Sequence, residues 1–271
     1  MEDRTSMSVF SEKNKPSFRR LEKIRNTFFQ AHWLWPLVAN SKYYDRWLGQ
    51  HDQHLTLFAK VQRRIDWILR RMWFWPNLHD VVPWSEQEIG TGWEPRKYVE
   101  LIPSSLVLVD EVEARTSGPD ASILDLGCNC GRHLNALVER GFTNLFGVDI
   151  GRAALDYMQV AFPILKTHAC VDHMSFQEFI SIADTNAYEI IFSHGATVEL
   201  VHPSFPLVKE VARVAKEYVI LVIQENGHSY PRFWTYEFQR AGFVLVKLVR
   251  PCAQNDEREF EQSLMVFRKI H

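Results

Sequence analysis

Short apolar runs alternate along residues 122–268 with segments whose apolar residues return at helical spacing. Between two of these runs, Ala154, Tyr157, Met158 and Ala161 stand at i, i+3, i+4 and i+7, which places them on one face of a helix. Short apolar runs bounded by turn residues are typical of buried strands, so the pattern predicts strands separated by helices. The predicted strands cover residues 122–126, 144–148, 164–171, 188–192, 218–223, 243–249 and 263–268.

The last two apolar runs are joined by a polar segment, which predicts an antiparallel hairpin. The expected fold class is therefore α/β: an open, seven-stranded, mostly parallel sheet with helices on both faces and an antiparallel terminal hairpin. Two of the predicted helices end near Gly141 and Gly242, since glycine readily terminates a helix. The helical patterns cover residues 96–115 with a break at Pro103, then 134–141, 154–161, 205–216 and 232–241.

The first third of the chain follows a different pattern. Residues 1–17 are polar and predict a disordered tail. Residues 18–95 show helical spacing followed by a loop, and they hold eight of the nine tryptophans. We interpret most of these aromatic residues as the core of a helical, aromatic-rich cap. An alternative is a substrate lid in which Trp84, Trp93 and Tyr98 line a crevice.

Charge is distributed unevenly although the net charge is only −2. Residues 1–80 hold 14 Lys and Arg against 8 Asp and Glu, whereas the remainder holds 17 against 25. This asymmetry suggests two regions with different tasks. Mixed Arg and Trp residues at helical spacing over 63–75 also suit a helix on a membrane surface, which we keep as a minor alternative.

The lack of a recognisable targeting segment, together with the cysteine usage, predicts a cytoplasmic protein. Met1–Lys15 is polar and lacks an apolar signal segment, and no run reaches the ~18 apolar residues of a spanning helix. The four cysteines include no C-x-x-C pair. We therefore expect neither a disulfide framework nor a metal site.

The most informative stretch lies around the first two predicted strands. The first strand ends at Asp125 and meets a turn that contains Gly127 and Gly131, after which a helical pattern begins. The second strand ends at Asp149, about 20 residues after Gly127. Glycines allow the backbone to approach a ligand, and an acid after the next strand can accept ribose hydroxyls. This layout predicts a site for a nucleoside-bearing cofactor.

Three details narrow the choice of cofactor. The loop Gly-Cys-Asn-Cys-Gly lacks the last glycine of the pyrophosphate fingerprint. Asp125 would repel a pyrophosphate but suits an ammonium group. The predicted sheet also ends in an antiparallel hairpin. With these features, residues 122–270 resemble the class I S-adenosylmethionine-dependent methyltransferases, and we expect the methyltransferase domain to span residues 96–271. The segments that resemble the family's motifs are 124–131, 147–150, 188–193, 199–203 and 210–214.

The resemblance implies S-adenosylmethionine as cofactor and assigns its contacts. Asp125 would reach the amino group, Asp149 would accept the ribose hydroxyls, and Ile150 would pack on adenine. Two positions depart from the family, because Asn129 replaces the usual middle glycine and Ser175 stands where an Asp is common. Asn tolerates left-handed backbone, so the turn remains possible. The other implied cofactor contacts are Gly127, Cys128, Gly131, Ser175, Phe176, Ser193 and Tyr98.

Methyl transfer needs alignment of donor and acceptor and, for some acceptors, a base. His202 is the first candidate because it begins the loop after the fourth-strand motif, and the alternative is a capping or turn histidine. His194 is a second candidate or a contact of the cofactor carboxylate. Glu225 and Glu199 are further candidates, or ordinary loop and helix residues. Arg132 is expected to face solvent in the first turn of its helix.

The predicted function is methylation of a small molecule, with O-methylation of a sugar, a saccharide or a natural-product intermediate favoured. A nucleic-acid methyltransferase that uses the basic N-terminal region is one alternative. Against it, the fourth strand ends Phe192-Ser193-His194-Gly195 instead of Asn/Asp-Pro-Pro-Tyr/Phe, so no nucleic-acid partner is expected. A non-catalytic scaffold is another alternative. The acceptor and the oligomeric state stay open.

Overall fold

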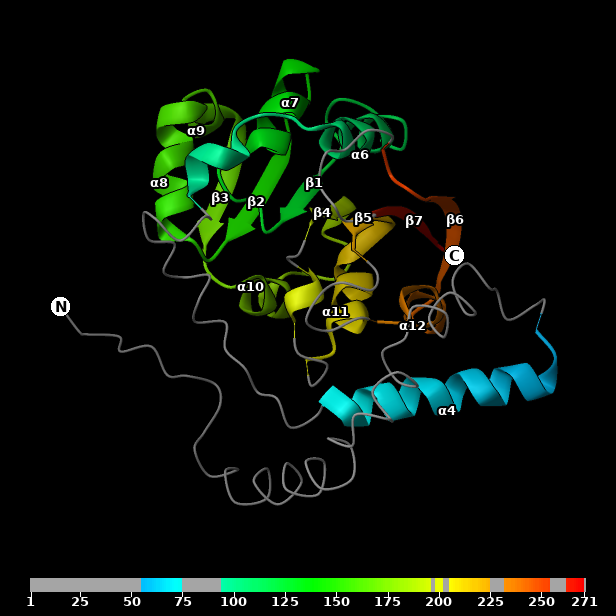
Figure 1. Cartoon of the computed structure of the whole chain (residues 1–271). Helices are drawn as coiled ribbons and strands as arrows, with labels where there is room; N and C mark the ends of the chain where they lie inside the picture. The colour runs from blue at the N-terminus through cyan, green and yellow to red at the C-terminus, as the bar shows by residue number, and fades with distance from the viewer. Residues whose placement is uncertain are drawn as a thin grey trace, which may run out of the picture.

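The computed structural model describes residues 55–74, 94–195, 198–201, 205–224, 232–253 and 262–270. Within these ranges, seven strands form one sheet in the order β3-β2-β1-β4-β5-β7-β6 (Figure 1). Strands β1 to β5 pair in parallel, and β7 pairs antiparallel with both β5 and β6. The predicted fold class is confirmed. The strands are β1 (Ile123–Leu126), β2 (Leu145–Asp149), β3 (Ala169–His173), β4 (Tyr188–His194), β5 (Ala215–Ile223), β6 (Phe243–Val249) and β7 (Ser263–Lys269).

Helices cover both faces of the sheet (Figure 1). Successive residues of each central strand point to opposite faces, and in β1 Ile123 and Leu124 are both fully buried in separate clusters. One face carries α6 (Pro103–Glu113), α7 (Arg132–Glu139), α8 (Arg152–Ala161) and α9 (Leu165–His168). The other face carries α10 (Phe176–Ile182), α11 (Leu207–Val214) and α12 (Trp234–Arg240).

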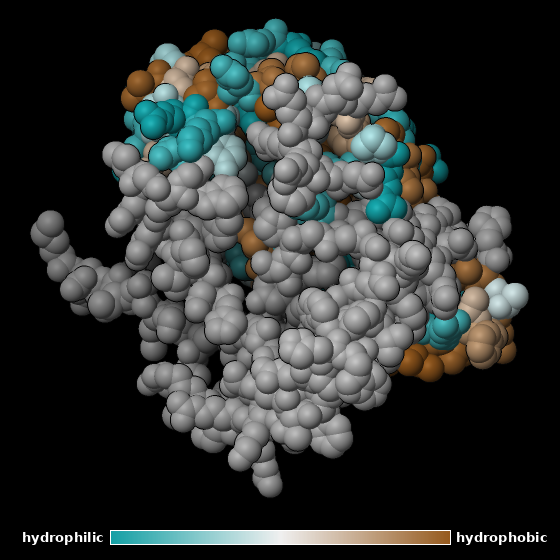
Figure 2. All heavy atoms as spheres, viewed as in Figure 1, coloured by the Kyte–Doolittle hydropathy of each residue, from teal (hydrophilic) through white to brown (hydrophobic). Residues whose placement is uncertain are grey.

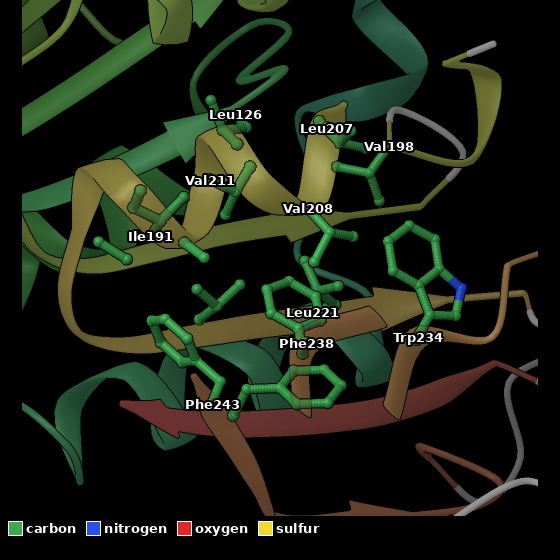
Figure 3. Close-up of a cluster of buried hydrophobic side chains, with 14 of the residues drawn as sticks. Leu126, Ile191, Val198, Leu207, Val208, Val211, Leu221, Trp234, Phe238 and Phe243 are labelled. Atoms are coloured by element: carbon green, nitrogen blue, oxygen red, sulfur yellow. The ribbon is translucent and has the colours of Figure 1, made fainter. Parts of the chain in front are cut away.

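The apolar core on the second face lies between the sheet and helices α11 and α12 (Figure 3). Leu207, Val208 and Val211 share one side of α11 and pack toward Leu221 of β5. The Phe238 ring stacks on that of Phe267 with 4.2 Å between centroids. This packing holds α11 and α12 on the sheet.

The predicted third strand, 164–171, is partly wrong. Residues 165–168 form the single turn of α9, and β3 starts only at Ala169. The turn closes locally, since the Leu165 N–H donates to the Phe162 carbonyl at 3.0 Å and the Thr167 hydroxyl donates to the Ile164 carbonyl at 3.1 Å. Ile164 and Leu165 are apolar but the next three residues are polar, and this mixed pattern does not distinguish the turn from the start of a strand.

The helix predicted over 96–115 is also wrong in part. The structure has a 3-10 helix η3 (Pro95–Tyr98), a connecting segment, and then α6. Pro103 begins α6 instead of breaking a longer helix, because proline fits the first helical position, where its missing N–H has no intrahelical partner.

Helix α4 (Leu57–Phe74) lies beside α12 (Figure 1). Leu55 and Ala59 pack against the core on that side, and the buried Arg63 guanidinium lies 4.4 Å from the centroid of the Tyr236 ring. A set of apolar side chains on α4 is exposed, and Figure 2 shows hydrophobic atoms at that edge of the molecule. These side chains are Leu57, Phe58, Val61, Ile65 and Ile68.

Most of the predicted N-terminal appendage, including the tail 1–17, Trp84 and Trp93, lies outside the described residues. Among the residues that are described, no helix has the length and apolar character needed to cross a membrane.

Candidate functional site

The loop that follows β1 adopts left-handed backbone at three residues. The φ angles are 79° at Gly127, 50° at Asn129 and 81° at Gly131, so the expectation that Asn129 tolerates this conformation is confirmed. A Cβ on Gly131 would lie 2.7 Å from Leu165 Cδ1, so a side chain there would displace Leu165 and would also be strained by the positive φ. The Gly127 N–H donates to the Val148 carbonyl at 2.9 Å and closes the loop over the end of β2.

Asp149 is the last residue of β2, and the backbone binds both of its carboxylate oxygens. Oδ2 accepts the Asn129 N–H at 2.8 Å, and Oδ1 accepts the Gly151 N–H at 2.7 Å. Burial raises the pKa of Asp149, while these two hydrogen bonds oppose the rise. Each oxygen has a further lone pair, so the half-buried carboxylate can also accept hydroxyl groups of a ligand. Ile150 follows and is half-buried beside it.

Asp125 lies one strand away in different surroundings. It is 1% exposed, and neither carboxylate oxygen receives a hydrogen bond from the described part of the chain. Burial raises its pKa to about 8, and the nearby Arg132 charge acts in the opposite direction. A buried carboxylate without hydrogen bonds is costly, and a bound cation would relieve this cost. The site therefore fits a ligand ammonium group.

Arg132 is buried, with 6% exposure, which overturns the expectation that it faces solvent. Its Nη1 donates to the Glu100 carbonyl at 3.2 Å, its Nη2 lies 3.1 Å from His194 Nδ1, and its Nε donates to His133 Nε2 at 3.3 Å. The first turn of α7 is covered by the segment that joins η3 to α6, and this tertiary contact removes Arg132 from water.

Two serines at the start of α6 complete the polar cluster. Ser104 Oγ lies 3.0 Å from His194 Nε2, and Ser105 Oγ lies 3.1 Å from His133 Nε2. Burial, assisted by the Arg132 charge, holds the pKa of His133 well below its usual range. Sequence reasoning missed His133 and both serines. The only signal was two adjacent hydroxyl residues directly after Pro103.

Tyr98 lies against the glycine loop. The Cys130 thiol donates to the Tyr98 carbonyl at 3.3 Å, and the Tyr98 side chain packs against the apolar core on the α7 face. Cys128 is buried in the same loop, and burial raises the pKa of both thiols. Cys130 thus helps hold η3 against the loop.

Three further predicted cofactor residues have structural partners. Ser175 caps α10 by accepting the Glu178 N–H at 3.2 Å, and Phe176 begins that helix and packs on the core. Both follow the end of β3 closely. Ser193 is fully buried and donates its hydroxyl to the Leu126 carbonyl at 2.8 Å, so its side chain joins β4 to β1.

The candidate bases lie around the carboxyl end of β4. His194 ends β4 and has a partner at each ring nitrogen, and Glu199 is buried in η4 (Val198–Leu200). His202 and Glu225 lie outside the described residues. Nearby, the buried Arg232 donates to the Val201 carbonyl at 2.9 Å. The carboxyl ends of parallel strands are where open α/β sheets bind ligands.

Comparisons with known proteins agree with this architecture. A family model described as a methyltransferase domain matches residues 123–218. No curated protein matches the sequence.

Solved structures share the fold at low identity. A chain from the complex between the Haloferax volcanii Trm112 methyltransferase activator and the putative methyltransferase has a TM-score of 0.51 and 15% identity, over 62% of this chain and 91% of that chain. Magnesium protoporphyrin IX methyltransferase (ChlM) from Synechocystis PCC 6803 with bound SAM has a TM-score of 0.52 and 12% identity, over 73% and 90%. At these identities the likeness shows the fold alone.

Proposed function

Since residues 123–218 match a methyltransferase domain, we propose that the chain is a class I S-adenosylmethionine-dependent methyltransferase and that it methylates an oxygen of a small organic acceptor. The cofactor supplies a methyl group activated on a sulfonium. The chain's own task is then to hold this donor, to align the acceptor with it and to exclude water.

The observation that supports the donor site is the contrast in hydrogen bonding between two acids at neighbouring strand ends. Asp125 is buried without a hydrogen bond from the described residues, so we assign it to the cofactor ammonium. Asp149 is held by two backbone N–H groups with lone pairs to spare, so we assign it to the ribose hydroxyls. Ile150, Tyr98 and the loop backbone at Gly127 would flank the rest of the cofactor.

We propose that the base, where the acceptor needs one, comes from the loops after β4 and β5. His202 and Glu225 remain the candidates there. His194 is less suited to this task, because Arg132 donates to Nδ1 and Ser104 faces Nε2. A general base needs a free lone pair within reach of the acceptor proton.

A sugar, a saccharide or a natural-product intermediate is the proposed acceptor class. Beyond residue 80 acidic residues outnumber basic ones by 25 to 17, which disfavours a phosphate-rich polymer on the methyltransferase domain. The end of β4, Phe192-Ser193-His194-Gly195, also lacks the Asn/Asp-Pro-Pro run used to methylate base amino groups.

The test combines donor binding with an acceptor screen on the full chain. Calorimetry should detect micromolar binding of S-adenosylmethionine. Release of S-adenosylhomocysteine should then be measured with monosaccharides, nucleotide sugars, phenols, RNA and DNA, using a carbon-13 methyl donor so that NMR identifies the methylated atom. Turnover with a hydroxyl compound is expected. Turnover with nucleic acid alone would favour that alternative, and donor binding without turnover on any acceptor would favour a scaffold.

A further inference from the structure

We propose that Arg132 is a positioning residue that fixes His133 and His194 as two different neutral tautomers beneath the glycine loop, and so keeps Asp125 open to the ammonium group of the methyl donor. The second half of this proposal rests on the proposed donor site. The first half concerns the protein alone.

The guanidinium of Arg132 spans three parts of the fold. Its nitrogens donate to the Glu100 carbonyl before α6, to His133 on α7 and to His194 at the end of β4, at 3.2, 3.3 and 3.1 Å. A guanidinium has only donors and stays charged throughout the physiological range. Each ring nitrogen that receives one of its N–H groups must therefore be unprotonated.

This requirement determines the tautomer of His194. Nδ1 accepts from Arg132, so the ring proton resides on Nε2 and points to Ser104 Oγ, 3.0 Å away. A doubly protonated ring would place an N–H against the guanidinium. His194 is thus held neutral and oriented by one contact on each side.

His133 takes the opposite tautomer. Its Nε2 faces both the Arg132 Nε–H and the Ser105 hydroxyl, so the ring proton resides on Nδ1. Nδ1 lies 3.5 Å from Asp125 Oδ2. The two imidazole rings are close, with 5.0 Å between centroids, yet they carry their protons on different atoms.

The neutrality of His133 has a consequence for donor binding. An imidazolium at this position would form an ion pair with Asp125 and compete with the ammonium group of the cofactor. Arg132 opposes this state because its charge and the burial of the ring both disfavour a second cation. The groups that face His133 are Asp125 from β1, His194 from β4, Ser105 from α6 and Arg132 itself. On β2, the pKa of Asp149 is raised in part by the negative charge of Asp125.

Nitrogen-15 NMR of histidine-labelled full-length protein tests the tautomers directly. In the cofactor-free wild type we expect His133 protonated at Nδ1 and His194 at Nε2, with neither ring titrating between about pH 6 and about pH 8. Arg132→Gln removes the charge, and Arg132→Lys keeps it but cannot reach three acceptors. In both variants we expect at least one ring to change tautomer or to titrate. A wild-type His133 protonated at Nε2, or unchanged spectra in both variants, would overturn the proposal.

The pH dependence of donor affinity provides the functional readout. Arg132→Gln should weaken S-adenosylmethionine binding by about tenfold near pH 6, because His133 can then pair with Asp125, and the gap should narrow toward about pH 9 as that proton is lost. A loss that is the same at every pH would indicate a merely structural role. Arg140→Gln, on the partly exposed end of the same helix, is the matched control and should follow the wild type. If the wild type binds no donor, the proposed donor site is refuted. The NMR spectra test the tautomers independently of that result.

Discussion

Asp125 and Asp149 stand at the ends of two neighbouring parallel strands, yet their surroundings give the same side chain two different properties. The backbone hydrogen-bonds both oxygens of Asp149, and the residue remains half-buried. Asp125 is 1% exposed and has no such bonds within the described residues. Hydrogen bonds stabilise a carboxylate where desolvation alone disfavours it. The fold therefore supplies hydrogen bonds to the Asp149 carboxylate, whereas burial favours the protonated form of Asp125.

The largest expected effect comes from removing the acid that the backbone supports. Asp149→Ala should weaken S-adenosylmethionine binding at least about 100-fold, because it removes the proposed ribose acceptor and leaves the Asn129 and Gly151 N–H groups unpaired, at about 1–3 kcal/mol each. Calorimetry and thermal denaturation measure both effects. Asp149→Asn retains one acceptor oxygen, so its donor affinity should lie between those of the wild type and the Ala variant. An Ala variant that binds like the wild type would remove the ribose assignment.

Asp125→Asn should weaken donor binding about tenfold near neutral pH, since the proposed ammonium contact loses its charge. Stability should change in the opposite direction. With burial raising its pKa to about 8 from 3.8, the folded chain retains a proton that the unfolded chain has lost. The stability of the cofactor-free wild type therefore falls as pH rises from about 4 to about 8, and is level above that.

The Asn variant lacks this dependence, so its advantage in Tm should grow up to about pH 8 and then stay constant. Thermal denaturation across that range is the measurement. Asp156→Asn, an exposed acid that pairs with Arg152, is the control and should show no such trend. A wild type and an Asp125→Asn variant with parallel pH profiles would contradict the buried-acid interpretation.

Gly151→Pro makes Asp149 more like Asp125, because it deletes one of the two backbone N–H groups that donate hydrogen bonds to the Asp149 carboxylate. Proline suits the φ of −79° at this residue but has no N–H. Compared with Gly151→Ala, which keeps the N–H, the Pro variant should bind the donor about fivefold more weakly. Equal affinities of the two variants would mean that this hydrogen bond does not support the Asp149 site.

Asn129→Gly should have the smallest effect. Glycine accepts the φ of 50° and keeps the N–H that Asp149 receives, although it loses the 2.7 Å contact between the Asn129 side chain and the Cys130 N–H. Donor affinity should stay within about twofold of the wild type. Asn129→Val, whose branched side chain resists positive φ, is the contrasting variant and should lower Tm. A large loss in the Gly variant would give the Asn129 side chain a role of its own.

The sequence predicted the sheet well because periodicity is local. Four of the five parallel strands and both hairpin strands were located within a few residues, since each is an apolar run with clear boundaries. The errors occurred where local signals were ambiguous. Residues 165–168 contain only one apolar residue and form the turn α9, so the predicted third strand began too early. Pro103 can either break a helix or begin one.

By itself, the sequence determined the class of fold, the glycine loop and the two acids that the resemblance assigns to the donor, because these depend on residues close together in the chain. Only the tertiary structure decided that Arg132 is buried and what it binds. Its partners Glu100 and His194 lie 32 and 62 positions away, and the contact from Ser104 to His194 spans 90. No local pattern encodes such distances. Packing of α6 and α7 over the strand ends excludes water there, and burial then sets which of these groups are charged.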